Sequence, residues 1–216
     1  MGKTRILCFG DSLTWGYNPK TGNRLHDDER WTGILQEELG KNFTIIEEGQ
    51  NGRTICTEDP AEGEKNGLKY LQPCMESHSP LDYMIIMLGT NDLKQKFNYA
   101  AMDIAGEMEM FLQKVLMINR FKMKNRLKVI LMAPPIVGEN IRESWFGDSF
   151  GYENAIEVSK KLAEHYKILS EIYKIGFINA ADYVEVSKED SIHMDAANHE
   201  KLGKVVAEYI KHDMKK

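Results

Sequence analysis

Five short apolar runs, separated by longer segments with helical spacing of apolar residues, constrain the fold of this chain more than any other feature. The runs are RILCF (5–9), FTIIE (43–47), YMIIML (83–88), KVILMAP (128–134) and GFINA (176–180). All but the second are almost continuously apolar, which is typical of parallel strands buried on both faces. Helical spacing marks the segments 31–40, 99–124, 154–174 and 196–215. This alternation predicts an α/β fold, a three-layer αβα sandwich around a five-stranded parallel sheet.

Composition excludes several other classes of protein. The 216 residues are 42% hydrophobic and 28% charged with a net charge of −5, so we expect a single globular domain over 1–216 and no nucleic-acid partner. No apolar run approaches the roughly 20 residues of a membrane helix, so we expect no membrane contact. The three cysteines, Cys8, Cys56 and Cys74, lack Cys-x-x-Cys spacing, which argues against a zinc ribbon. Free thiols and the absence of a leader predict a cytoplasmic protein.

Two Gly-Asp-Ser sequences compete as the source of a serine nucleophile. Ser12 follows the first apolar run, in a turn where open α/β sheets bind ligands, beyond the carboxyl end of a strand. Ser149 matches the Gly-x-Ser-x-Gly elbow pattern, but an elbow needs a buried strand before it, and NIRESWF is polar and irregular. We therefore favour Ser12 and expect Asp11 beside it to bond backbone N–H groups.

A serine hydroxyl needs a base, usually a histidine that a carboxylate orients. Among the six histidines only His193 has an acid three residues before it, Asp190. On a tight turn this spacing places the carboxylate on the imidazole, although a surface loop histidine explains the pattern equally well. His199 is expected on the surface of the last helix, because no further ligands for a two-histidine metal site accompany it.

The oxyanion formed during acyl transfer needs hydrogen-bond donors. Asn91 follows the third strand in LGTND, and Gly52 follows the second in EEGQNGRT. Each alone is explained as an ordinary turn residue. Together with Ser12 they follow three successive strands, so all would meet at one sheet edge, with Asp190 and His193 in the loop before the last helix.

These separated blocks, FGDSLTWG, GQNGRT, LGTND and DSIHMD, resemble the SGNH (GDSL-type) hydrolases, especially their bacterial arylesterase and acyltransferase branch. The resemblance implies a flavodoxin-like fold and hydrolysis of small acyl esters through an acyl-enzyme, with neither cofactor nor metal. It implies a triad of Ser12, Asp190 and His193. The implied oxyanion donors are the Ser12 and Gly52 N–H groups and the Asn91 amide. It also implies a homo-oligomer, and we expect the loop 136–152 to shape the acyl pocket.

Two other interpretations of function stay open on the sequence. The same fold and chemistry serve a carbohydrate acetylesterase, a thioesterase or a lysophospholipase, with a different pocket. A flavodoxin-like module that binds phosphate or flavin is less favoured than an esterase, because Asp11 brings negative charge to the first loop and no glycine-rich spacing is present. The segment 102–123 holds five methionines, which we expect to fill the core rather than to bind a metal or a partner.

Overall fold

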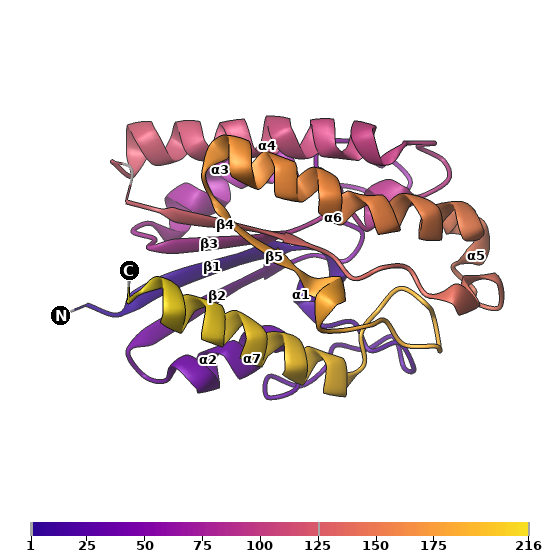
Figure 1. Cartoon of the computed structure of the whole chain (residues 1–216), viewed down its shortest axis with the longest axis horizontal. Helices are drawn as coiled ribbons and strands as arrows, with labels where there is room; N and C mark the ends of the chain where they lie inside the picture. Colours follow the sequence, from indigo (N-terminus) through magenta and orange to yellow (C-terminus); the bar gives the residue numbers. More distant parts are fainter. Residues whose placement is uncertain (1, 125, 216) are drawn as a thin grey trace.

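The computed structural model describes residues 2–124 and 126–215, which build a five-stranded parallel sheet with helices on both faces (Figure 1). The strands are β1 (Thr4–Gly10), β2 (Phe43–Gly49), β3 (Tyr83–Met87), β4 (Lys128–Ala133) and β5 (Gly176–Asn179). They lie in the order β2-β1-β3-β4-β5, and every neighbouring pair is parallel. The predicted fold class and all five strands are confirmed.

Two layers of helices explain why the strands are so apolar. Helices α3 (Gly67–His78), α4 (Ala101–Lys122) and α6 (Glu153–Tyr173) cover one face, and α2 (Trp31–Leu39) and α7 (Ala196–Asp213) cover the other. In β1, Leu7 and Phe9 pack on the first layer while Ile6 and Cys8 pack on the second. Strand β2 lies at the sheet edge and is only half-buried, in keeping with its less apolar sequence.

The carboxyl ends of the strands meet toward one end of the molecule, at the right of Figure 1, and both termini lie at the other end. Two short helices, α1 (Ser12–Trp15) and α5 (Gly147–Phe150), lie at the first of these ends. So do the one-turn 3₁₀ segments Asn91–Leu93, Glu139–Arg142 and Ala180–Asp182, each of which follows a strand. The loops in which the sequence places the chemistry therefore converge.

Helix α3 is an element that the sequence interpretation missed. Its interior contains Pro73, which ordinarily breaks a helix, and its outer face is polar. The helix forms because the Asn66 side chain accepts from the Lys69 N–H as an N-cap, and because Leu71 and Met75 are fully buried against the sheet.

The prediction for the five methionines of α4 and the turn that follows it was wrong for three of them. Met108 and Met123 are buried in the core as expected. Met102, Met110 and Met117 are 65%, 55% and 43% exposed, because they lie on the outward side of the helix. Among the described residues, no helix is long and apolar enough to cross a membrane.

Candidate active site

Ser12 is held by the tight turn that leaves β1. Asp11 caps α1 by accepting from the Leu13 N–H at 2.9 Å, as expected for this carboxylate, and Ser12 becomes the first residue of the helix. A Cβ on Gly10 would lie 2.2 Å from Thr14 Oγ1 and 2.8 Å from the Met87 carbonyl, so no other residue fits before the turn. The Ser12 side chain therefore lies in a fixed position at the end of β1.

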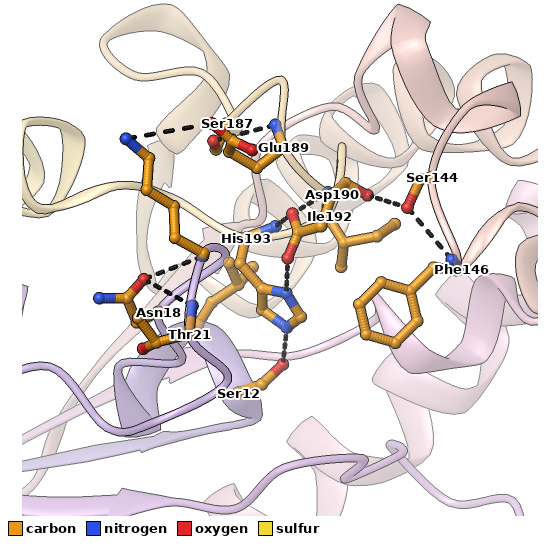
Figure 2. A network of polar contacts seen from close by, with 12 residues as sticks. Ser12, Asn18, Thr21, Ser144, Phe146, Ser187, Glu189, Asp190, Ile192 and His193 are labelled. Carbon is orange, nitrogen blue, oxygen red and sulfur yellow. Dashed lines mark hydrogen bonds and ion pairs between the residues drawn. The ribbon is translucent and has the colours of Figure 1, made fainter.

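His193 and Asp190 complete a hydrogen-bonded series with Ser12 (Figure 2). His193 Nε2 lies 2.8 Å from Ser12 Oγ, and Nδ1 lies 2.7 Å from Asp190 Oδ2. A carboxylate only accepts, so Nδ1 carries the proton and the Nε2 lone pair faces the serine hydroxyl. Both His193 and Asp190 are buried, which corrects the alternative of a surface loop histidine.

The loop before α7 fixes the Asp190 carboxylate from several sides. Its Oδ1 accepts from the backbone N–H groups of Ile192 at 3.0 Å and His193 at 2.9 Å. The Ser144 hydroxyl donates to the Asp190 carbonyl at 2.6 Å and joins this loop to the segment 136–152 (Figure 2). Ser191 has a φ of +61°, an uncommon conformation that lets the turn bring Asp190 back to His193.

Two aromatic rings enclose the His193 imidazole. The ring centroid of Tyr17 lies 4.2 Å from it, and that of Phe146 lies 5.6 Å away on an edge-on approach. Burial and the nearby Asp190 carboxylate raise the pKa of Tyr17, so this ring stays neutral. The rings keep water from the sides of the imidazole and limit its rotation.

A cavity of about 240 Å³ opens over Ser12 and His193. Its apolar wall comes from Tyr17, Ile192 and the loop residues Trp145, Phe146 and Phe150. Its polar wall comes from Asn51, Gly52, Glu62, Asn91 and Lys94. The loop 136–152, which we expected to shape the acyl pocket, thus supplies part of the lining of this cavity. A larger hollow of about 710 Å³ between α6, β5 and α7 contains neither serine nor histidine.

The two remaining predicted residues, Gly52 and Asn91, line the same cavity as Ser12. The Asn91 amide donates to the Arg53 carbonyl at 3.1 Å, which fixes its orientation and leaves its second N–H available. Gly52 has a φ of +80°, and a Cβ there would lie 2.1 Å from Glu62 Oε2. Only glycine fits at this position without displacing the carboxylate.

A group of ion pairs around the buried Lys94 and Asp59 borders the polar wall of the cavity and was not predicted. Lys94 is 4% exposed and bonds the Glu62 carboxylate, and its Nζ lies 3.6 Å from Asp59 Oδ2. Lys96 Nζ lies 2.6 Å from the same Asp59 carboxylate. These contacts hold the segment 59–63 against the cavity. Charged residues in an irregular loop gave no sequence signal for such a contact.

Buried carboxyl groups lie behind the cavity. Burial raises the pKa of Asp11 to about 7, although the Leu13 N–H and the Arg53 cation oppose the shift. Burial also raises the pKa of Asp92 strongly, and the neighbouring Glu107 carboxylate adds to the effect. Asp92 Oδ1 accepts from the Ile55 N–H at 3.0 Å, so this group tethers the turn of Asn91 to the loop after β2.

The structure separates the other two sequence candidates from this arrangement. Ser149 borders the cavity from the four-residue helix α5, but among the described residues no hydrogen bond joins its hydroxyl to an imidazole. His199 was expected on the surface and is instead fully buried. Its Nδ1 accepts from the Trp31 N–H at 3.3 Å, because α7 packs closely against α2, and burial lowers its pKa to about 3.

Comparison with known proteins gives matches over most of the chain. The GDSL-like lipase/acylhydrolase family matches residues 8–201. An aryl esterase of M. smegmatis is 37% identical, covers 97% of this chain and 99% of its own, and superposes with a TM-score of 0.89. A carbohydrate acetylesterase of Sinorhizobium meliloti gives the same identity, coverage and TM-score.

A multidomain esterase of Ruminococcus flavefaciens is 26% identical over 238 residues, which cover 97% of this chain. The chain spans only 28% of the length of that relative. The family match and the solved esterase structures cover nearly the whole chain. The protein therefore belongs to the GDSL-like lipase/acylhydrolase family, the SGNH hydrolases, and is a carboxylic ester hydrolase.

Proposed function

We propose that this protein hydrolyses small acyl esters, acetyl or aryl, through an acyl-enzyme formed on Ser12. One observation carries the proposal: Asp190, His193 and Ser12 are joined by contacts of 2.7 and 2.8 Å beside a cavity. Hydrogen-bond reach between nucleophile and base, with a third group orienting the base, is what acyl transfer requires.

In the first half of the reaction, Ser12 Oγ attacks the ester carbonyl carbon while His193 Nε2 takes the hydroxyl proton. The tetrahedral intermediate collapses, the bond to the leaving alcohol breaks, and His193 returns the proton to that alcohol. In the second half, His193 takes a proton from water, which attacks the acyl-enzyme carbonyl. The bond between the acyl group and Ser12 Oγ then breaks, His193 returns the proton to Ser12 Oγ, and the acid leaves. An alcohol entering in place of water gives acyl transfer by the same steps.

The oxyanion forms beside Asn91 and Gly52, and we assign its stabilisation to the Asn91 amide and the Ser12 and Gly52 N–H groups. The positive φ of Gly52 and the Arg53 contact of Asn91 hold both residues in place before substrate binds. Donors fixed in advance stabilise developing charge without reorganisation. Asp190 acts as the positioning group and stabilises the imidazolium that forms.

The size of the cavity supports a short acyl group. At about 240 Å³ it lies below the usual range of roughly 300–1,000 Å³ for small-molecule sites. The apolar side accepts an acetyl or aryl group, and a long acyl chain or a lysophospholipid does not fit within it. Among the described residues that line the cavity, the one lysine or arginine is Lys94, which Glu62 neutralises, so the lining lacks the free cation of a phosphate cradle.

A second candidate is hydrolysis of acetylated carbohydrates. Trp145 borders the cavity and is 74% exposed, with its ring packed on Phe146 at 4.8 Å between centroids. An exposed indole that borders the cavity offers a flat surface on which a sugar ring can lie. The carbohydrate acetylesterase among the similar structures supports this candidate.

The test compares Ser12→Ala with Ser149→Ala on p-nitrophenyl esters of increasing acyl length and on an acetylated sugar. We expect Ser12→Ala to abolish turnover, Ser149→Ala to retain it, and activity to fall as the acyl chain lengthens. Loss of activity with Ser149→Ala alone would overturn the assignment. Trp145→Ala should lower turnover of the sugar ester more than that of the p-nitrophenyl acetate if the carbohydrate is the substrate.

Three further expectations stay predictions: a single domain over 1–216, a homo-oligomer and a cytoplasmic location. Sedimentation velocity on the purified chain tests the oligomer directly. A single species with the mass of one chain, 24.8 kDa, would contradict it.

A further inference from the structure

Three side chains of metal-ligating type meet between the edge strand β2 and helix α3. Cys74 and His78 are four residues apart on α3, so both lie on the same side of the helix. Glu48 comes from β2, the strand that α3 follows in the chain. One ligand atom from each residue, a thiol sulfur, an imidazole nitrogen and a carboxylate oxygen, lies within 4.8 Å of the others.

The three atoms are close to the positions that a single ion requires. Ligands of one tetrahedral Zn²⁺ lie roughly 3.5 Å apart, since its bonds to sulfur, nitrogen and oxygen are about 2.0–2.3 Å long. His78 Nε2 now lies 2.6 Å from Glu48 Oε1, so these two groups would separate by roughly 1 Å. The His78 and Glu48 side chains are 30% and 17% exposed, which gives them freedom to move and leaves a position for water.

Glu47 is a useful contrast on the same strand. Its carboxylate is fully engaged, with Arg30 donating to both oxygens and the Thr32 hydroxyl donating as well. The contacts of the Glu48 carboxylate are different: His78 at 2.6 Å and the Tyr70 hydroxyl at 3.4 Å. These contacts hold the Glu48 carboxylate less completely than the Arg30 guanidinium holds that of Glu47, and the His78 imidazole and the Cys74 thiol beside it are themselves candidate ligands.

The local charge suits a divalent ion. Glu48 contributes one negative charge, and a thiolate at Cys74 contributes a second. Together they balance the two positive charges of the ion, so the nearby Arg53 guanidinium faces a neutral site. Arg53 is itself held in place by the carbonyls of Gly10 and Glu48, to which it donates.

We propose that Glu48, Cys74 and His78 form a binding site for a divalent transition-metal ion, with Zn²⁺ the ion that this donor set favours. Zn²⁺ accepts mixed sulfur, nitrogen and oxygen ligands in a four-coordinate geometry, whereas Mg²⁺ and Ca²⁺ require oxygen ligands. On binding, the Cys74 thiol gives its proton to the buffer, and a sulfur–metal bond replaces the sulfur–hydrogen bond. Water completes the coordination.

This site is separate from the proposed ester chemistry. None of its three residues lines the cavity over Ser12. A bound ion is expected to stabilise the packing of α3 against the edge strand β2. No metal was expected from the sequence, because the cysteines lack Cys-x-x-Cys spacing and the helix that brings Cys74 and His78 together was not predicted.

The test is a Co²⁺ titration of the full chain after chelator treatment, followed by absorption spectroscopy. Co²⁺ reports its ligands through a thiolate charge-transfer band in the near ultraviolet and through visible bands typical of four-coordination. We expect both bands to saturate at one equivalent and to disappear when Zn²⁺ is added. Cys74→Ala should remove the charge-transfer band. His78→Ala and Glu48→Gln should each weaken Co²⁺ binding by about 10-fold to 100-fold.

The matched controls are Cys56→Ala and His165→Ala, which remove a thiol and an imidazole elsewhere and should leave the titration unchanged. A thermal melt provides a second measurement: Zn²⁺ should raise the melting temperature of the wild type and not that of His78→Ala, a variant at a partly exposed position. Absence of the charge-transfer band, its survival in Cys74→Ala or its loss in Cys56→Ala would each overturn the proposal.

Discussion

Replacing Asp190 by asparagine tests the proposed role of its carboxylate with a minimal change of shape. Asp190 Oδ1 accepts from two backbone N–H groups, those of Ile192 and His193. The asparagine oxygen must take this position, because an NH₂ group there would face two donors. The NH₂ group then occupies the position of Oδ2, 2.7 Å from His193 Nδ1.

This exchange reverses the tautomer of His193. Nδ1 must now accept from the amide, so the proton moves to Nε2, which faces Ser12 Oγ at 2.8 Å as a donor. The imidazole can no longer take the serine proton. Wrong-tautomer substitutions of this kind lower kcat by about 10⁴-fold, which corresponds to roughly 5.5 kcal/mol of transition-state stabilisation.

The assay is steady-state hydrolysis of p-nitrophenyl acetate. We expect KM to change little, because Asp190 does not line the cavity, and the melting temperature to stay close to that of the wild type. Asp195→Asn is the matched control, since it makes the same chemical change at the N-cap of α7 and should retain full activity. A loss in kcat of less than about 10-fold in Asp190→Asn would refute the reasoning.

Three further predictions concern Asn91, Asp11 and His199. Asn91→Ala should lower kcat by roughly 10²–10³-fold on a short aryl ester, and unchanged turnover would exclude it as an oxyanion donor. The pKa of Asp11 is about 7 in the folded protein, against about 3.9 in the unfolded chain, so the folded state holds this proton more tightly. The stability of the wild type therefore falls as the pH rises from about 3.9 to about 7. Urea unfolding should therefore show Asp11→Asn gaining up to about 4 kcal/mol relative to wild type between pH 4 and pH 8, and a pH-independent difference would contradict this. The pKa of His199 is about 3 in the folded protein, against about 6.5 in the unfolded chain, so the unfolded chain binds a proton first as the pH falls. Below pH 6.5 the free energy of unfolding of the wild type should therefore fall by about 1.4 kcal/mol per pH unit more than that of His199→Asn. Parallel acid unfolding curves for the two proteins would exclude this.

The strands were predictable because helices cover both faces of the sheet, which makes their sequences almost continuously apolar. The convergence of Ser12, Gly52 and Asn91 followed from the same property, since parallel strands end at one edge of the sheet. The structure places these residues and His193 around one cavity. Their assignment did not depend on any single motif, and the better match to the elbow pattern, Ser149, lacks the strand that would position it.

Other features depend on contacts that local sequence does not encode. Helix α3 was not predicted because its interior contains Pro73, and the helix forms because Leu71 and Met75 are buried. His199 is buried only because α7 packs on α2 and brings it to the Trp31 N–H. The ion pair of Lys94 and Glu62 joins two loops 32 residues apart, and polar loop sequence alone does not indicate which charges will meet.

The most direct test of the proposed chemistry is covalent labelling of the nucleophile. The full chain is treated with a p-nitrophenyl alkylphosphonate, digested and analysed by mass spectrometry, with Asp190→Asn treated in parallel. We predict a single adduct on the peptide that contains Ser12, loss of esterase activity in proportion to labelling, and much slower labelling of Asp190→Asn. An adduct on Ser149, or full inactivation with Ser12 unmodified, would contradict the account.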